Sequence, residues 1–329
     1  MTEPTEPPEP PEPPTPVFDV EEPGLFTTIQ DFGRPGRYGA GIPTGGAMDR
    51  FALAAANVLV GNAEDAPALE CTMSGPALRA RRPCVVAVAG ADFEPLRNGR
   101  PLPNWESVFL AGGDLLSFGG RRLGARAYVA VAGGLHADRW LGSAGTYLLL
   151  RRGGLQGRQL QAGDELALGG EPRRPSVAGR ALPPYLRPAY GEEVEVRAVP
   201  GPHSTRLGPR GRRAFHGTVW QVSRDSDRMG YRLEGPELDL KMADLISFGL
   251  AMGCVQVPPS GQPILLLADH QTAGGYPVVA GVARVDLPLA AQLVPGDGIR
   301  FRETPLAEAQ DAWRRSELVL EELKGARTG

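Results

Sequence analysis

The sequence has few cysteines and lacks the spacings that bind metals. Its three cysteines, Cys71, Cys84 and Cys254, are odd in number and form no CxxC pair. Its four histidines form no HxxxH or HExxH pattern. These absences predict a reducing compartment without a disulfide framework or a metal site. Each cysteine is expected to behave as a small core residue.

Long apolar runs and an excess of one charge are also missing. No run of about 18 apolar residues occurs, so we expect no membrane span. The N-terminus has no basic-then-apolar leader pattern, and 35 basic against 38 acidic residues give no electrostatic case for nucleic acid or a membrane surface. We predict a cytoplasmic protein whose two arginine clusters are solvated loops: Arg79, Arg81 and Arg82, then Arg210, Arg212 and Arg213.

Glycine and proline, by contrast, are abundant, at 44 and 33 residues. Between them lie short β-type runs such as CVVAVAG and PILLLAD, with too few helices for βαβ units. We predict a mainly β protein with five parts: a disordered Pro/Glu-rich tail (1–16), an N-terminal β module (17–170), a linker (171–192), a C-terminal β module (193–303), and a C-terminal helix with its tail (304–329).

Two segments have helical spacing. Residues 47–60 place apolar side chains on one face before Gly61 and Asn62. The second helix is expected to open with Thr304 as N-cap and Pro305 as first helical residue. Its predicted apolar face comprises Leu306, Ala309, Trp313, Leu320 and Leu323.

The two β modules read as copies of one unit. Asp49-Arg50 recurs as Asp227-Arg228, and QLQAGDELAL (159–168) recurs as QLVPGDGIRF (292–301). If the copies face each other, their Asp-Arg pairs meet at the interface, where ligand sites are common.

Three polar constellations are candidates for the site. Residues 222–238 carry five charged residues in their first eleven positions, in a pattern that fits either a substrate grip or a self-neutralised polar turn. A strand end and a glycine-rich loop precede Asp49, and that loop fits either a ligand wrap or a flexible connector. The apolar run ILLL leads into a third loop, in which His270 follows Asp269. A His beside an Asp suggests a general base, although neighbours on a strand point to opposite faces.

The candidates fall into two groups. The residues predicted to be catalytic are Asp49, Arg50, Asp227, Arg228 and Asp269. Those predicted to bind substrate are Gln30, Asp31, Arg34, Tyr231, His270, Gln271, Thr272 and Tyr276.

Five segments in this order carry a resemblance to a known family: GLFTTIQDFGRPG, PTGGAMDRFALAAANVLVGN, ALECTMSGPAL, SDRMGYRLEGPEL and VQVPPSGQPILLLADHQTAGGYP. Residues 20–305 resemble the family of 5-oxoprolinase C subunits, also described as KipA-like, allophanate hydrolase subunit 2-like or biotin-dependent carboxyltransferase-like. The resemblance implies two tandem cyclophilin-like β-barrel modules. It also implies two partners, a KipI-like 5-oxoprolinase B subunit and a LamB/YcsF-type A subunit.

The resemblance further implies ATP-dependent hydrolysis of 5-oxo-L-proline to L-glutamate, with ATP, and Mg with it, held here or shared with a partner, since no P-loop is present. In this scheme Arg50 and Arg228 neutralise a phosphate or carboxylate, while Asp49 or Asp227 orients the lactam N–H or a water. Two alternatives remain. One is a biotin-dependent carboxyltransferase with biotin on another chain. The other is a KipA-type regulator that antagonises a KipI-like kinase inhibitor.

Overall fold

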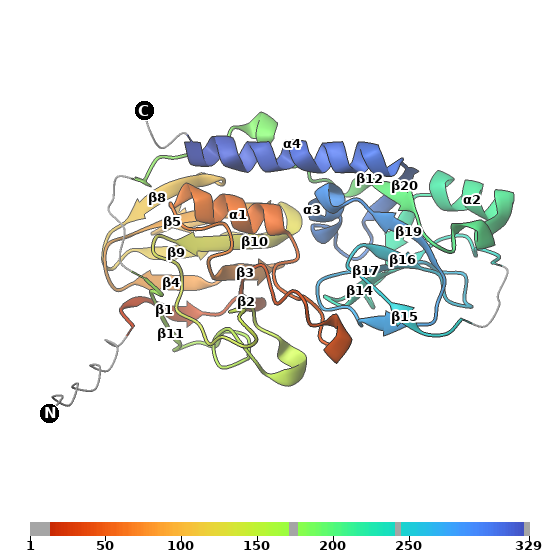
Figure 1. Cartoon of the computed structure of the whole chain (residues 1–329). Coiled ribbons are helices and arrows are strands. Elements are labelled where there is room, and N and C mark those ends of the chain that lie inside the picture. The colour runs from red at the N-terminus through yellow and green to blue at the C-terminus, as the bar shows by residue number, and fades with distance from the viewer. Residues whose placement is uncertain (1–13, 171–176, 241–244, 326–329) are drawn as a thin grey trace, which may run out of the picture.

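The computed structural model describes residues 14–170, 177–240 and 245–325 and is mainly β, as predicted (Figure 1). The strands of the N-terminal part are β1 (Pro16–Glu22), β2 (Phe26–Gln30), β3 (Ala68–Thr72), β4 (Ala77–Ala80), β5 (Cys84–Asp92), β6 (Pro95–Arg97), β7 (Arg100–Pro101), β8 (Glu106–Leu110), β9 (Leu115–Phe118), β10 (Leu123–Val131) and β11 (Glu165–Ala167). Those of the C-terminal part are β12 (Glu193–Pro200), β13 (Trp220–Val222), β14 (Gly230–Glu234), β15 (Phe248–Gly249), β16 (Cys254–Gln256), β17 (Ile264–Leu266), β18 (Ala273–Gly274), β19 (Val278–Val282) and β20 (Gly298–Glu303).

The N-terminal strands form two open sheets, ordered β11-β1-β4-β9-β6-β7 and β2-β3-β10-β5-β8. Side chains of β5 alternate between two cores, as the period of a strand requires. Val86 packs between the two sheets, whereas Val85 packs beneath helix α1 (Arg50–Leu59). The expectation of a closed barrel is therefore not met in the described N-terminal residues, where a helix-covered sheet faces a second sheet.

The C-terminal strands form one closed barrel, ordered β12-β19-β16-β17-β14-β13-β20. Its parallel pair, β12 with β20, joins the start of the module to its end. Trp220, Leu265 and Phe301 are fully buried inside. The short ribbon of β15 and β18 lies outside the barrel. The predicted second β module is thus confirmed as a barrel.

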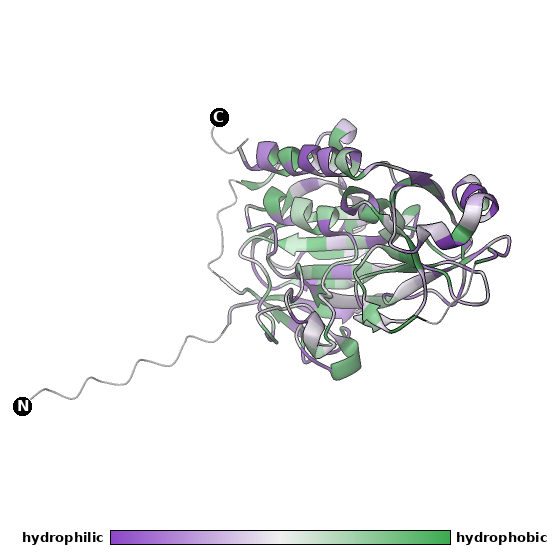
Figure 2. Ribbon diagram, turned by 45° about the vertical axis from the view of Figure 1, so that its right-hand side comes forward, coloured by the Kyte–Doolittle hydropathy of each residue, from purple (hydrophilic) through white to green (hydrophobic). Residues whose placement is uncertain are grey.

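Helices cover the junction between the two parts. The long helix α4 (Leu306–Gly325) runs over α1 on one side and reaches the barrel on the other (Figure 1). Figure 2 shows hydrophilic and hydrophobic residues alternating along it. Ala309 and Leu323 are buried, but Leu306 is 58% exposed, so the predicted apolar face is only partly correct. The hydroxyl of Thr304 donates to the Arg302 carbonyl rather than capping the helix.

Two short helices were not predicted: α2 (Gly208–Gly217) and α3 (Leu287–Ala291). The second arginine cluster lies on α2. This helix is anchored to the barrel by Phe215, whose ring stacks on that of Phe301. Of the first cluster, Arg79 lies on β4 and pairs with Glu21, and Arg81 follows β4 and pairs with Asp19. The prediction of solvated loops therefore holds for Arg81 and Arg82, which lie in the bend after β4, and is wrong for Arg79 and for the second cluster.

The proposed repeat has a structural counterpart at its Gly-Asp turns. Asp164 accepts a hydrogen bond from the Gln161 amide at 2.7 Å, and Asp297 accepts one from the Val294 amide at 2.9 Å. Each turn also bonds its own valine, Val20 or Val222, through the same pair of backbone bonds. The two copies therefore share a local backbone geometry as well as a sequence.

Several sequence expectations fall partly outside the described residues. The Pro/Glu-rich tail lies there up to residue 13, and β1 already begins at Pro16. Of the predicted linker, residues 171–176 lie outside; beyond them, Leu182 is fully buried. Cys71 and Cys84 are buried, and burial raises the pKa of Cys84 to about 12. In the described chain, no helix is both long enough and apolar enough to cross a membrane.

Candidate functional site

A buried ionic cluster joins the two parts of the chain. Arg228, in the loop before β14, donates from Nε to Asp269 at 2.8 Å and from Nη2 to the Gly46 carbonyl at 2.7 Å. Its Nη1 donates to Glu70 on β3. Burial alone would lower the pKa of Arg228, but Asp269 and Glu70 outweigh burial and raise it. The second Asp-Arg pair thus supplies one cation that holds carboxylates from both sides.

The network continues through Glu70 to α1. Glu70 accepts hydrogen bonds from the Tyr128 hydroxyl at 2.7 Å and the Met48 amide at 2.8 Å. The Tyr128 hydroxyl in turn accepts from the amide of Asp49, the N-cap of α1. The buried carboxylate of Asp49 accepts from the Ala52 amide, and its Oδ2 accepts from two further side chains: the Tyr190 hydroxyl at 2.6 Å and Gln292 Nε2 at 2.9 Å.

Asp49 therefore holds α1 against the barrel through Gln292. Burial raises the pKa of Asp49, and its hydrogen-bond donors partly offset this rise. Asp49 is not among the residues that line a cavity of about 940 Å³ or a smaller one of about 320 Å³. The position of Asp49 favours a structural role over the predicted catalytic one.

Arg34 is the second cation at the junction and has unused hydrogen-bonding capacity. It follows β2, is 1% exposed, and donates from Nη2 to the Gly145 carbonyl. Its Nε and Nη1 are buried without a hydrogen-bond partner. Trp140 and Tyr147 lie with ring centroids 5.3 Å from its guanidinium carbon. Burial lowers the pKa of Arg34, and Asp31 and Asp269 oppose this effect. We call Arg34, Glu70, Arg228 and Asp269 the junction cluster.

His270 lies beside this cluster but does not pair with Asp269. Its Nδ1 lies 2.7 Å from the Gln271 carbonyl, and its ring stacks on Tyr38 at a centroid distance of 5.8 Å. Nε2 lies 3.5 Å from the Tyr38 hydroxyl. Asp269 is instead committed to Arg228, as expected for neighbours that point to opposite sides. Burial lowers the pKa of His270, so the ring is held in its neutral form.

This burial predicts a pH-dependent stability. Because the folded pKa of His270 lies below the unfolded value of about 6.5, the unfolded state binds more protons as pH falls below that value. The contribution of His270 to the free energy of unfolding should therefore be fully present above pH ~6.5. Below that pH the free energy of unfolding should decline, by up to ~1.4 kcal/mol per pH unit from this group. Urea unfolding of wild type and His270→Gln between pH ~7.5 and ~5 measures the difference. The same substitution at exposed His136 is the control, and equal slopes in all three proteins would contradict the prediction.

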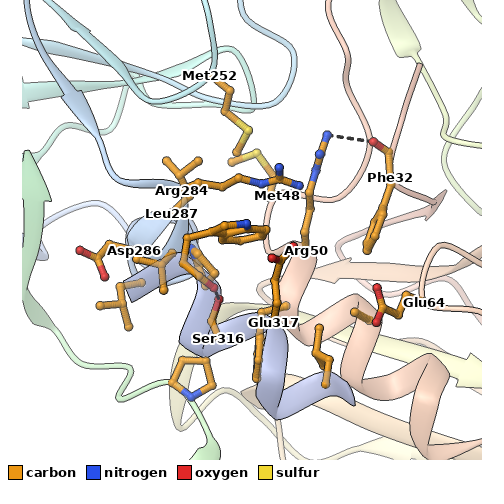
Figure 3. A pocket seen from close by; sticks show the side chains of 18 of the residues that line it. Phe32, Met48, Arg50, Glu64, Met252, Arg284, Asp286, Leu287, Ser316 and Glu317 are labelled. Carbon is orange, nitrogen blue, oxygen red and sulfur yellow. Dashed lines mark hydrogen bonds between the residues drawn. The ribbon is translucent and has the colours of Figure 1, made fainter. Parts of the chain in front are cut away.

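A cavity of about 940 Å³ adjoins the junction cluster. Gly45 connects the two: it lines the cavity, and a Cβ built on it would lie 2.8 Å from Arg34 Nη1 and 3.4 Å from Asp269 Oδ1. We call this the junction cavity. Figure 3 shows the side chains around it. Its walls come from three sources: Met48 and Arg50 of the N-terminal part, Met252 and Arg284 of the barrel part, and Trp313 and Glu317 of α4.

Arg50 is the predicted site residue that reaches this cavity. It begins α1, and its Nη2 donates to the Phe32 carbonyl at 2.8 Å (Figure 3). Its Nε is buried without a hydrogen-bond partner. Burial lowers the pKa of Arg50, and the neighbouring Arg284 lowers it further.

Other predicted residues do not converge on the cavity. Asp227 is exposed and accepts from the Met229 and Gly230 amides, which makes it a turn former. Tyr231 is buried and donates to the Leu293 carbonyl.

Asp31 uses both carboxylate oxygens within its own region. It accepts from the Gly33 amide, the Ser143 hydroxyl and the Ala144 amide. Gln30 donates to Thr28 and the Thr146 carbonyl, although its Oε1 is buried without a partner.

The last three predicted substrate contacts lie around the β15–β18 ribbon. Gln271 donates to Gln256, which itself donates to the Tyr276 carbonyl. The carbonyl of Thr272 accepts from the Leu250 amide. The lining of the junction cavity, as far as the described residues define it, includes none of the three predicted contacts.

Sequence reasoning missed Glu70, Tyr128, Gln292, Arg284 and Trp313. Glu70 carries a usable signal, because it is a single carboxylate inside the apolar strand ALECT, where a buried charge needs a partner. Arg284 and Trp313 give no local signal, since only the packing of α4 brings them together.

This arrangement can hold an anionic or amide ligand. Arg50 lines the junction cavity, and Arg34 lies next to Gly45 at its edge. Both carry buried N–H donors without a hydrogen-bond partner, and such donors bind carboxylate, phosphate or a developing oxyanion. Among the residues described, no group of three or more His, Cys, Asp and Glu is arranged to hold a metal ion.

Comparisons with known proteins show which sequences this chain resembles. Residues 40–303 match the family model for the carboxyltransferase domain, subdomain A and B. The chain is 37% identical to the 5-oxoprolinase C subunit of Haemophilus influenzae over 298 residues, which cover 90% of this chain and 94% of that protein. It is also 37% identical to the 5-oxoprolinase C subunit of Escherichia coli, over 91% of this chain and 95% of that protein.

A solved structure agrees. The crystal structure of the Kluyveromyces lactis urea amidolyase matches with a TM-score of 0.89 at 28% identity over 95% of this chain. This chain spans only 20% of that much longer protein. Together, the family match and the relatives aligned over nearly their whole length show that the chain belongs to the carboxyltransferase domain, subdomain A and B, family.

Proposed function

We propose that this chain is the C subunit of an ATP-dependent 5-oxoprolinase, which hydrolyses 5-oxo-L-proline to L-glutamate. The observation that carries the proposal is the 37% identity over 94% of a 5-oxoprolinase C subunit. The letter C implies companion chains, and we take these to be a KipI-like B subunit and a LamB/YcsF-type A subunit, acting in the cytoplasm. The paired sequence copies further support a division into two related β modules with the boundaries given above, of which the C-terminal closed barrel is the cyclophilin-like one.

The chemistry accounts for the need for ATP. Opening a five-membered lactam to glutamate is uphill near neutral pH, and the amide oxygen must be activated before water attacks. Phosphorylation of that oxygen activates it and creates negative charge near the reacting carbon. The unpaired buried donors of Arg34 and Arg50 are suited to that charge or to the substrate carboxylate. Arg228 acts on the site through Glu70 and Asp269, which it holds in place.

The fit to ATP is partial. The junction cavity, at about 940 Å³, is within the range of small-molecule sites, and arginines line it. No glycine-rich phosphate loop is present, however, and the described residues offer no cluster of ligands for Mg. We therefore assign ATP to a site shared with a companion chain, to which this chain contributes arginine side chains.

A second candidate function is biotin-dependent carboxyl transfer. The description of the matching family and the 31% identity to a urea amidolyase of Lachancea kluyveri favour it. Biotin would then come on another chain, with urea or a similar amide as acceptor.

Reconstitution tests the proposal. We expect glutamate release from 5-oxoproline and ATP when this chain is mixed with both companion chains, and none when this chain or the companions are assayed separately. Carboxylation of urea with biotin, bicarbonate and ATP, in the absence of glutamate release, would instead establish the second candidate.

A substitution at Arg34, assayed in the active mixture, tests whether this residue contributes to the reaction. Arg34→Gln removes a cation with two unpaired donors, so kcat/KM should fall at least about tenfold. Arg100→Gln, on the exposed hairpin of β6 and β7, is the matched control and should retain full activity. Unfolding curves of both variants separate loss of the site from loss of the fold.

A further inference from the structure

Two arginines from different parts of the chain line the junction cavity, and the charge of one acts on the other. Arg50 comes from the first turn of α1, and Arg284 comes from the 3₁₀ helix η6 (Arg284–Asp286), which follows β19. Figure 3 shows the Arg284 side chain reaching toward Arg50, whose guanidinium group turns to the Phe32 carbonyl. Like charges held close together repel, and an anion between them removes that repulsion.

Neither arginine forms an ion pair with a carboxylate among the described residues. Arg50 donates only to carbonyl oxygens, those of Phe32 at 2.8 Å and Gly45 at 3.5 Å. The guanidinium carbon of Arg284 lies 4.1 Å from the centroid of the Trp313 ring. This stacking fixes the plane of a guanidinium but leaves its edge of N–H donors free.

The acidic residues of the cavity wall are mostly committed elsewhere. Glu64 and Glu321 both pair with Lys324, at 2.6 and 2.7 Å. The carboxylate of Asp286 pairs with the Arg197 guanidinium at 2.6 Å. Glu317 remains, and it points into the cavity from α4 (Figure 3). Among the described lining groups without an ion pair, three arginines, Arg50, Arg187 and Arg284, therefore outnumber one carboxylate.

We propose that Arg50, Arg284 and Trp313 form a subsite for the oxyanion group of a small ligand, either a carboxylate or a phosphate. Two neighbouring guanidinium groups that line one cavity match the two or three oxygens of such a group. The identity of the ligand rests on the proposed function, in which 5-oxoproline supplies a carboxylate and ATP supplies phosphates. Helix α4 completes this subsite through Trp313, although it lies beyond the residues 40–303 that match the family model.

Calorimetric titration tests the subsite directly. The full chain, alone and in the reconstituted complex, is titrated with 5-oxo-L-proline, 2-pyrrolidinone (the same lactam without its carboxylate), inorganic phosphate and ATP. Arg284→Gln should weaken binding of the anionic ligand at least about tenfold, because one charged donor pair is lost. Glu317→Gln should tighten it about twofold or more, because a like charge is removed. Arg100→Gln is the control and should leave affinity unchanged.

Each outcome decides a specific point. Arg284-dependent binding of 5-oxoproline but not of 2-pyrrolidinone identifies a carboxylate subsite, whereas Arg284-dependent binding of ATP or phosphate alone identifies a phosphate subsite. Anion affinity that is unchanged by Arg284→Gln, or the absence of anion binding by both chain and complex, overturns the proposal. Glutamate release is measured separately, so the subsite can fail while the 5-oxoprolinase assignment stands, and the reverse.

Discussion

Replacement of Arg228 by methionine should destabilise the protein by about 3–5 kcal/mol, because it leaves carboxylates buried without their cation. Arg228 holds Glu70, which is 1% exposed, and Asp269 in one cluster. Methionine preserves most of the side-chain volume, so the loss reports charge rather than packing. Urea unfolding followed by circular dichroism gives the difference in the free energy of unfolding. Activity of the reconstituted complex should be lost in parallel.

Two further variants make this result specific. Arg232→Met changes an exposed arginine on β14 and should stay within about 0.5 kcal/mol of wild type. Adding Glu70→Gln to Arg228→Met removes one orphaned charge and should recover part of the lost stability, because residues in one ionic network are not additive. A loss below about 1 kcal/mol for Arg228→Met would show that the junction cluster does not act as a unit.

Local patterns in this chain predict its strands and helices better than they predict whether its sheets close into a barrel. The strands of both parts and the helices α1 and α4 follow from periodicity, because each buries an apolar face whose spacing the sequence displays. The difference between a closed barrel and two open sheets is set by long-range pairing. In the N-terminal part α1 covers one face of the five-stranded sheet, so that sheet is buried on both sides without closing. No short segment encodes that choice.

The candidate site shows the same division. The repeat of Asp-Arg pairs correctly drew attention to the junction, where Arg228 and Asp49 both lie. The different roles of Asp49 and Asp227 could not be predicted, because both residues stand in the same Asp-Arg pair. Asp227 caps its own turn in solvent, whereas Asp49 is buried as the N-cap of α1. Arg284 and Trp313 became candidates only through the packing of α4, since 28 residues lie between them in the sequence.

Gly33→Ala should disrupt the loop that carries Arg34, with a loss of several kcal/mol or failure to fold. Gly33 has φ +83°, and a Cβ there would lie 2.2 Å from the Thr44 carbonyl oxygen and 2.6 Å from that of Gly45. These contacts are with backbone, which cannot move aside as the end of a flexible side chain can. The Arg34 amide also donates to Thr44 at 2.7 Å, so the same crossing places Arg34 against the junction.

Gly36→Ala separates backbone strain from steric clash. Gly36 has nearly the same φ, +80°, but a Cβ there meets no atom within 4 Å. It should therefore cost only the left-handed strain of about 1–2 kcal/mol and retain activity. Equal losses of stability in the two variants would mean that the crossing of residues 31–34 with 44–47 is not tight. A large excess for Gly33→Ala, accompanied by loss of glutamate release, would show that glycine is required there because a second backbone segment occupies the space in which Arg34 is positioned.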